Sequence, residues 1–192
     1  MSSREKILQA VQQNKPELIN APVIAIEKQS NDLLQQFITT LESIGGKAFR
    51  VSSIDDVKND LQQAIAQGGY IVNTVESLGI VNSELTASTD AFALEPVFKA
   101  YIQGDLAVAE NGSVWLDEKN MVNRLLPFIC QHLILIVSVD SIVANMHEAY
   151  KQITIDKEGY GVFLAGPSKT ADIEQSLVIG AHGARSLIVY LV

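Results

Sequence analysis

Residues 162–174 read Val162-Phe163-Leu164-Ala165-Gly166-Pro167-Ser168-Lys169-Thr170-Ala171-Asp172-Ile173-Glu174, and Gly180-Ala181-His182-Gly183 follows after a short apolar segment. The four residues at the start predict a buried strand. Small residues, hydroxyls and one lysine come next, and the acidic residues after them favour the start of a helix. Open α/β sheets bind their ligands at the carboxyl ends of strands. The stretch therefore predicts a ligand site at a strand end, without naming the ligand.

Upstream of this stretch, helix and strand patterns alternate along the chain. Residues 31–44 place apolar side chains at helical spacing, and a second helix begins at the capping residue Ser53. Strands are expected at 47–51, 70–75, 133–139 and 187–192. Two successive strand–helix units of this kind predict a parallel sheet with crossover helices.

A β-hairpin is the other element that the sequence indicates clearly. Glu110-Asn111-Gly112 separates the apolar runs 106–109 and 113–116, and Asn-Gly between two such runs is a strong hairpin signal. Helices are further expected at 97–102 and 141–150. We therefore predict an α/β protein with a single domain, in which a mostly parallel sheet carries helices on both faces and a β-hairpin is added.

The amino-terminal part of the chain is predicted to be separate from this domain. Ser2-Ser3-Arg4-Glu5 is a capping box ahead of a short helix, and Pro16 and Pro22 follow it. We expect residues 1–29 to form an N-terminal helix and a linker, and residues 30–192 to form the α/β domain.

The composition restricts the classes of function. The 192 residues include 47% hydrophobic ones, enough for a well-buried domain, and carry a formal net charge of −8 without a basic run. Nucleic acids and anionic membranes need clustered cations, so we expect neither as a partner. No apolar stretch approaches the roughly 20 residues of a membrane span, and the amino terminus lacks a signal peptide, which predicts a cytoplasmic location. Cys130 is the single cysteine, so we expect no disulfide and no metal site within this chain.

The stretch after the predicted strand at 162–165 is a candidate anion-binding loop. Backbone N–H groups that follow Pro167 could point into a crevice, Lys169 supplies a cation, and a helix beginning near Asp172 would add the positive end of its dipole. The alternative is an ordinary capped turn, and the spacing alone leaves the two equally open. The candidate ligand-binding residues in this loop are Gly166, Ser168, Lys169, Thr170 and Asp172.

His182 is the candidate acid, base or hydrogen-bond donor. It lies between Gly180 and Gly183, and glycines allow a ligand to approach the backbone closely, so Gly183 is counted as ligand-binding. The alternative is a turn with a partly exposed histidine. His132 precedes an apolar strand and is either structural or a residue that lines the crevice, while His147 is expected at the surface.

Glu110 is the second candidate catalytic residue. A carboxylate at the tip of a tight hairpin can act as a nucleophile and form an acyl intermediate. The alternative is a solvated turn residue. The fold could bring Glu110 together with the loop at 166–172 and His182, although their separation in the sequence says nothing about this.

These motifs resemble those of the lactate utilization protein C family, whose domain is called LUD. The resemblance spans roughly residues 30–192, and Ala184 stands where the family pattern has a proline, which predicts a less rigid loop after His182. The residues that carry the resemblance to this family are Ala109-Glu110-Asn111-Gly112-Ser113, Leu126-Pro127 ahead of His132, Gly166-Pro167-Ser168-Lys169-Thr170-Ala171-Asp172-Ile173-Glu174 and Gly180-Ala181-His182-Gly183.

The resemblance implies both a fold and a role. The fold would be similar to that of glucosamine-phosphate deaminase, ribose-phosphate isomerase and CoA transferases. The role would be the oxidation of L-lactate to pyruvate, in company with iron–sulfur proteins. A chain whose single cysteine is Cys130 agrees with clusters that sit on those partners.

Three functions are open at this point. The first is a subunit of a cytoplasmic iron–sulfur system for L-lactate utilization, with an anion- or cofactor-binding crevice in which Lys169 pairs with the anion and His182 exchanges a proton. The second is a stand-alone enzyme, similar to CoA transferases or to sugar-phosphate-processing enzymes, that uses Glu110. The third is a module that binds a small anionic metabolite without turnover.

Overall fold

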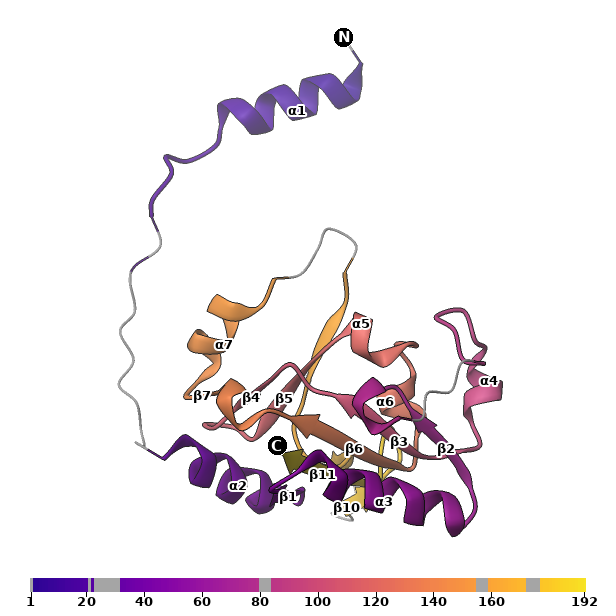
Figure 1. Ribbon diagram of the computed structural model, residues 1–192. Coiled ribbons are helices and arrows are strands. Elements are labelled where there is room, and N and C mark those ends of the chain that lie inside the picture. Colours follow the sequence, from indigo (N-terminus) through magenta and orange to yellow (C-terminus); the bar gives the residue numbers. More distant parts are fainter. Residues whose placement is uncertain (1, 21, 23–31, 80–83, 155–158, 172–176) are drawn as a thin grey trace.

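A five-stranded parallel sheet lies at the centre of the protein, which confirms the predicted α/β class (Figure 1). The computed structural model describes residues 2–20, 22, 32–79, 84–154, 159–171 and 177–192. In spatial order the strands are β1 (Lys47–Arg50), β11 (Ser186–Leu191), β6 (His132–Val137), β3 (Val97–Gln103) and β2 (Tyr70–Asn73). All four neighbouring pairs are parallel.

Helices cover both faces of this sheet, as predicted. Helix α3 (Ile54–Ala66) begins at Ser53, whose side chain accepts a hydrogen bond from the backbone of Asp55, and packs on one face. Helix α2 (Leu33–Ser43) buries Phe37 and Leu41 against the other face. Because both faces are covered, β6 is apolar at every position after its first residue.

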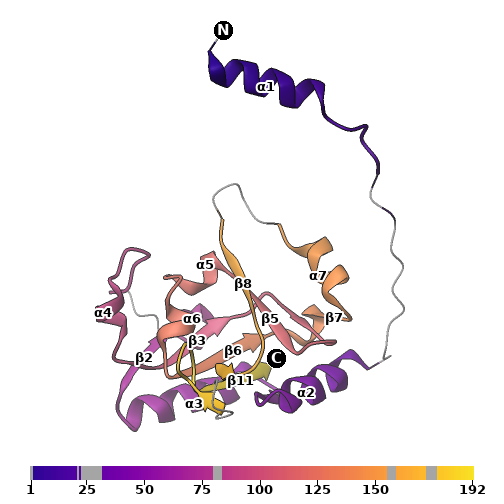
Figure 2. The same ribbon diagram turned by 180° about the vertical axis from the view of Figure 1, so that it is seen from behind.

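A second sheet packs on the same face as α2, in the strand order β7-β4-β5-β8. Strands β4 (Leu106–Val108) and β5 (Ser113–Asp117) form the predicted hairpin. Strand β7 (Ile142–Val143) runs parallel to β4, and β8 (Gly161–Leu164) runs antiparallel to β5. Figure 2 shows β8 descending from this second sheet to the neighbourhood of β11, so the motif after β8 arrives at the central sheet from outside it.

One predicted helix is wrong. Residues 97–102 lie in β3, where Phe98 is the extra residue of a bulge, since Tyr70 pairs with Val97 but Ile71 pairs with Lys99. After Pro167 comes a strand, β9 (Lys169–Ala171), which pairs antiparallel with β10 (Leu177–Ile179), and the helix start expected near Asp172 falls on residues outside those described. Asp172 lies outside the described residues.

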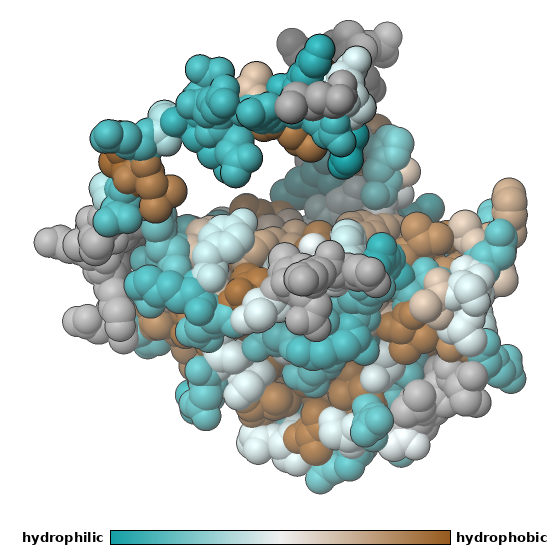
Figure 3. All heavy atoms as spheres, turned by 90° about the horizontal axis from the view of Figure 1, so that it is seen from above, coloured by the Kyte–Doolittle hydropathy of each residue, from teal (hydrophilic) through white to brown (hydrophobic). Residues whose placement is uncertain are grey.

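The other helices are short or distant from the sheets. Helix α1 (Ser3–Gln13) begins with the predicted capping box, and none of its side chains is buried. On the face of the molecule that Figure 3 shows from above, hydrophobic residues are spread among hydrophilic ones. Helix α7 (Met146–Gln152) begins five residues later than the expected 141–150. The remaining elements are α4 (Ala91–Leu94), α5 (Glu118–Met121), α6 (Leu126–Ile129) and the 3₁₀ turns η1 (Glu76–Leu78) and η2 (Val139–Ser141). Within the described ranges, no helix is long and apolar enough to cross a membrane.

The carboxyl end of α2 is enclosed by glycines from two distant motifs. Gly112, in the hairpin turn, has φ +68°, and a Cβ there would lie 3.0 Å from both the backbone nitrogen and the Cα of Leu41. Gly166 has φ +71°, and a Cβ there would lie 3.0 Å from the carbonyl oxygen of Ile44. Both glycines are therefore needed for close packing against α2, in addition to the backbone conformation that they adopt.

We expect Gly112→Ala to destabilise the protein more than a glycine substitution in open space. A positive φ costs an ordinary residue about 1–2 kcal/mol, and overpacking against a backbone adds about 1–3 kcal/mol. The matched control is Gly68→Ala, because Gly68 has φ +82° and no atom would lie within 4 Å of its Cβ. Urea unfolding should give Gly112→Ala a free energy of unfolding at least about 1 kcal/mol below that of Gly68→Ala. Equal losses would show that packing on α2 is unimportant.

Candidate functional site

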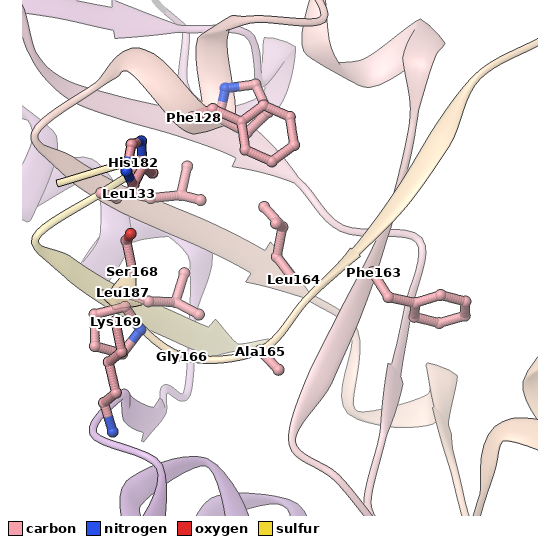
Figure 4. Close-up of a pocket in the computed structure, with 14 residues that line it drawn as sticks. Phe128, Leu133, Phe163, Leu164, Ala165, Gly166, Ser168, Lys169, His182 and Leu187 are labelled. Atoms are coloured by element: carbon pink, nitrogen blue, oxygen red, sulfur yellow. The ribbon is translucent and has the colours of Figure 1, made fainter. Parts of the chain in front are cut away.

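The two motifs from the carboxyl-terminal part of the chain meet at a cavity of about 270 Å³ (Figure 4). The loop after β8 forms one wall, and the loop that contains His182 forms another. Apolar side chains from α6, β6 and β11 complete it. The lining residues are Pro127, Phe128, Leu133, Phe163, Leu164, Ala165, Gly166, Pro167, Ser168, Lys169, His182, Gly183, Ala184 and Leu187.

The cavity lies at the amino ends of the parallel strands, whereas the sequence predicted a site at a carboxyl end. Leu133 is the second residue of β6 and Leu187 is the second residue of β11. The difference arises because β8, whose carboxyl end does lead into the motif as predicted, belongs to the second sheet and runs antiparallel to its neighbour β5. The motif still follows the end of a strand, but this strand is not part of the parallel sheet.

Backbone hydrogen bonds fix the loop around His182. Ser168 donates its N–H to the carbonyl of Ala184 at 2.9 Å, and its own carbonyl accepts from the N–H of Gly180 at 3.0 Å. Arg185 donates its N–H to the carbonyl of Gln131 at 2.8 Å. The loop is thus held at both ends, although Ala184 replaces the expected proline. Because the N–H of Ser168 is already used, it is not free to bind an anion.

Ser168 and His182 place polar side chains at the cavity. The Ser168 hydroxyl points toward His182 in Figure 4, and a Cβ on Gly183 would lie 3.1 Å from the Cβ of Ser168. Gly183 therefore lets the histidine loop approach Ser168 closely. His182 itself is exposed. The structure brings these three predicted residues together with Gly166.

Lys169 and Thr170 do not direct their polar groups into the cavity. The Lys169 side chain extends away from His182 (Figure 4), and a Cβ on Gly45 would lie 3.2 Å from its Nζ, so the ammonium group lies at the carboxyl end of α2. Thr170 donates its hydroxyl to the carbonyl of Val178 across the β9–β10 hairpin. The predicted combination of a lysine and a helix dipole is absent from the described part of this site.

His132 lies on the opposite face of the central sheet. Successive side chains of a strand point to opposite faces, and Leu133 lines the cavity, so His132 faces the side covered by α3. There its Nδ1 is 2.8 Å from the hydroxyl of Ser186, and its ring contacts Phe98 edge-on at 4.8 Å between centroids. The predicted role of His132 in lining this crevice is therefore wrong.

Glu110 is also separate from the cavity. Its carboxylate accepts a hydrogen bond from the backbone N–H of Met146 at 3.0 Å, at the start of α7. A carboxylate at a helix amino terminus satisfies a free N–H and interacts favourably with the dipole. The structure thus gives Glu110 a capping contact, and its catalytic role stays a prediction.

Sequence reasoning missed Phe128 and Arg185. Phe128 follows Leu126-Pro127, a pair that carried the family resemblance but had no role assigned to it. Arg185 lies two residues after Gly183 and lines a neighbouring cavity. The position of each beside a recognised motif was the signal that could have identified them.

Metal ligation by this chain finds no support in the described residues. They contain no group of three or more His, Cys, Asp or Glu side chains that could hold a metal ion. Cys130 is buried, and burial raises the pKa of its thiol to about 12. A thiol of this kind stays protonated near neutral pH, whereas cluster ligands are thiolates. An iron–sulfur cluster therefore does not fit the residues seen here.

The sequence profile of the LUD domain matches residues 97–192, which include the hairpin turn and both cavity motifs. This chain belongs to the LUD domain family. Lactate utilization protein C of Geobacillus kaustophilus is 36% identical over 41% of this chain and 35% of its own length, and that of Shouchella clausii is 37% identical over 41% and 37%. The matched segment is thus only about a third of these relatives.

A sequence match and a structural match in Deinococcus radiodurans extend the likeness over most of the chain. A lactate utilization protein C is 28% identical over 97% of this chain and 92% of its own length. The crystal structure of a DUF162 family protein superimposes with a TM-score of 0.64 at 19% identity, and covers 83% of this chain and 96% of that one. At this identity the superposition supports the LUD fold alone.

We expect His132 to reduce the stability of the folded state in mild acid. Burial, with smaller contributions from the charges of Lys99 and Arg185, lowers the pKa of His132 below its ordinary value of 6.5. The unfolded chain therefore takes up the proton more readily than the folded chain. The contribution of His132 is fully present above about pH 6.5 and is lost as the pH falls toward the folded-state pKa.

Urea unfolding at about pH 7.5 and about pH 5.5 measures this effect. The free energy of unfolding should change less between these pH values in His132→Gln than in the wild type. His147→Gln is the matched control, because His147 is exposed, and it should keep the wild-type pH dependence. A wild-type pH dependence in His132→Gln would contradict the expectation.

Proposed function

We propose that this chain acts in lactate utilization and that the cavity beside Ser168 and His182 binds a small carboxylate of the L-lactate class. The observation that carries the proposal is the convergence of two motifs on one cavity, where a hydroxyl and an imidazole face apolar side chains. The names of its relatives from Geobacillus, Shouchella and Deinococcus support the metabolic assignment.

The size and chemistry of the cavity suit such a ligand. Its volume of about 270 Å³ is below the roughly 300–1,000 Å³ of pockets that take drug-sized molecules. The hydroxyl of Ser168 and the ring of His182 can donate hydrogen bonds to a carboxylate or a hydroxyl. Leu133 and Leu187 offer an apolar surface for a methyl group.

We further propose that the chain works with iron–sulfur proteins. Oxidation of L-lactate to pyruvate breaks the O–H bond and the C–H bond at the carbinol carbon, forms the C=O bond, and releases two electrons and two protons. In this proposal His182 accepts the hydroxyl proton, solvent water takes up the proton from the carbinol carbon, and partner proteins that carry iron–sulfur clusters accept the two electrons. The buried thiol of Cys130 supports an assignment of the clusters to partners.

We expect the wild-type protein to bind L-lactate, and His182→Ala to weaken that binding about tenfold. Loss of one hydrogen bond to a charged group costs roughly 1.5–3 kcal/mol, which is tenfold or more in affinity. His182 is exposed, so the melting temperature should stay close to that of the wild type. Isothermal titration calorimetry measures the affinity, with His147→Ala as the control that should bind normally. Absence of L-lactate binding by the wild type would overturn the proposed ligand.

Partner association can be tested separately from ligand binding. The tagged chain, purified from its native host grown on lactate, should bring with it proteins that contain iron and acid-labile sulfide, because the proposed reaction needs an electron acceptor. The same purification from cells grown without lactate is the control. Purification of an iron-free chain by itself under both conditions would contradict the partnership.

A further inference from the structure

A second cavity, of about 330 Å³, adjoins the first on the other side of His182. Phe128, His182 and Gly183 contribute to both cavities, so the histidine loop is the wall between them. The residues that line the second cavity are Phe128, Ile129, Cys130, Gln131, Gly180, Ala181, His182, Gly183 and Arg185.

The lining of the second cavity is cationic, in a chain that is acidic overall. The formal net charge is −8, yet no Asp or Glu is among the lining residues that the structure describes. Arg185 supplies a positive charge at this cavity, and it forms no ion pair with any residue in the described ranges. An anion would therefore meet a guanidinium that no carboxylate of the described residues neutralises.

The side chain of Arg185 is held in place by the loop that precedes it. Gly180 has φ +84°, and a side chain at that position would collide with Cγ of Arg185, so the loop backbone packs directly on the arginine stem. The N–H of Arg185 donates a hydrogen bond to the carbonyl of Gln131, and the N–H of Gly180 donates one to the carbonyl of Ser168. Both ends of the loop are thus fixed, which reduces the entropy lost when a ligand binds.

We propose that Arg185 binds an anionic group, a carboxylate or a phosphate, in this second cavity. The planar guanidinium can donate two parallel hydrogen bonds to either group, and it stays charged at all physiological pH values. His182 donates an N–H from the wall that the two cavities share. A free inorganic anion and the anionic end of a larger metabolite would use the same contacts.

The matched comparison for Arg185 is Lys169. Both are exposed cations that line neighbouring cavities, but the ammonium of Lys169 lies at the end of α2 rather than in either cavity. Arg185→Gln and Lys169→Gln therefore remove the same charge from nearby positions. If anion binding depends on the guanidinium, only Arg185→Gln loses affinity. If it depends on the general positive charge of this region, both variants lose affinity equally.

Inorganic phosphate and acetate are the probes, titrated by calorimetry and by amide chemical shifts of the nitrogen-15-labelled chain. Arg185→Gln should weaken binding at least tenfold, Lys169→Gln less than twofold, and Arg185→Lys by an intermediate factor. Shifts should be largest for the amides of residues 180–185. No binding by the wild type, or equal losses in the two glutamine variants, would overturn the proposal. Melting temperatures close to that of the wild type verify that each variant is folded.

The same titrations separate this inference from the proposed function. L-lactate binding that Arg185→Gln retains reports on the first cavity, and phosphate binding that Arg185→Gln loses reports on the second. Phosphate binding that is lost in Arg185→Gln supports the anion site whether or not L-lactate binds. If Arg185→Gln instead loses L-lactate and phosphate binding together, the two ligands share one position and a separate anion site is excluded.

Discussion

The site depends on two backbone hydrogen bonds made by one residue, Ser168. Its N–H donates to the carbonyl of Ala184 and its carbonyl accepts from the N–H of Gly180, so both ends of the loop that contains His182 are attached to the residue before β9. These bonds satisfy polar backbone groups that would otherwise be left unpaired beside the cavity. They also place His182 between the two cavities. Ser168 therefore fixes the loop at residues 180–184 against the loop that follows β8, and the fixed loop carries the imidazole of His182.

Helix α2 is the support on which this arrangement rests. Gly112 and Gly166 both approach its last turn, and the ammonium of Lys169 lies beside the same helix end. A cation is favourable there, because the carboxyl end of a helix carries a partial negative charge. Residues whose types suggested an anion-binding loop thus contribute to packing and to helix electrostatics. Gly166 lies two residues after the end of β8, so its close approach to Ile44 occurs where the motif leaves that strand.

Much of the fold could be predicted from local patterns, because the apolar run of β6 and the Asn-Gly turn report on their surroundings directly. Residues 97–102 were misassigned because the bulge at Phe98 interrupts the alternation expected of a strand. For the site, Ser168 and His182 were predicted from the residue types of their two motifs, and both line one cavity because the two loops meet. His132 could not be placed from its spacing, since the face on which a strand residue lies depends on the register of the whole sheet. The contact of Glu110 with the start of α7 could not be predicted either, because the position of that helix beside the hairpin turn is determined only by the tertiary structure.

The contrast between the two exposed cations at the site follows from backbone geometry. Lys169 lies in β9, and its long flexible stem reaches the end of α2, where a point charge is sufficient. Arg185 precedes β11, and its stem is covered by Gly180, so its guanidinium stays at the second cavity. In a chain with net charge −8, an anion is repelled at long range and must be bound by local contacts. Short-range hydrogen bonds from Arg185 and His182 meet that requirement better than a diffuse positive surface would, which favours selectivity for small anions that can enter the cavity.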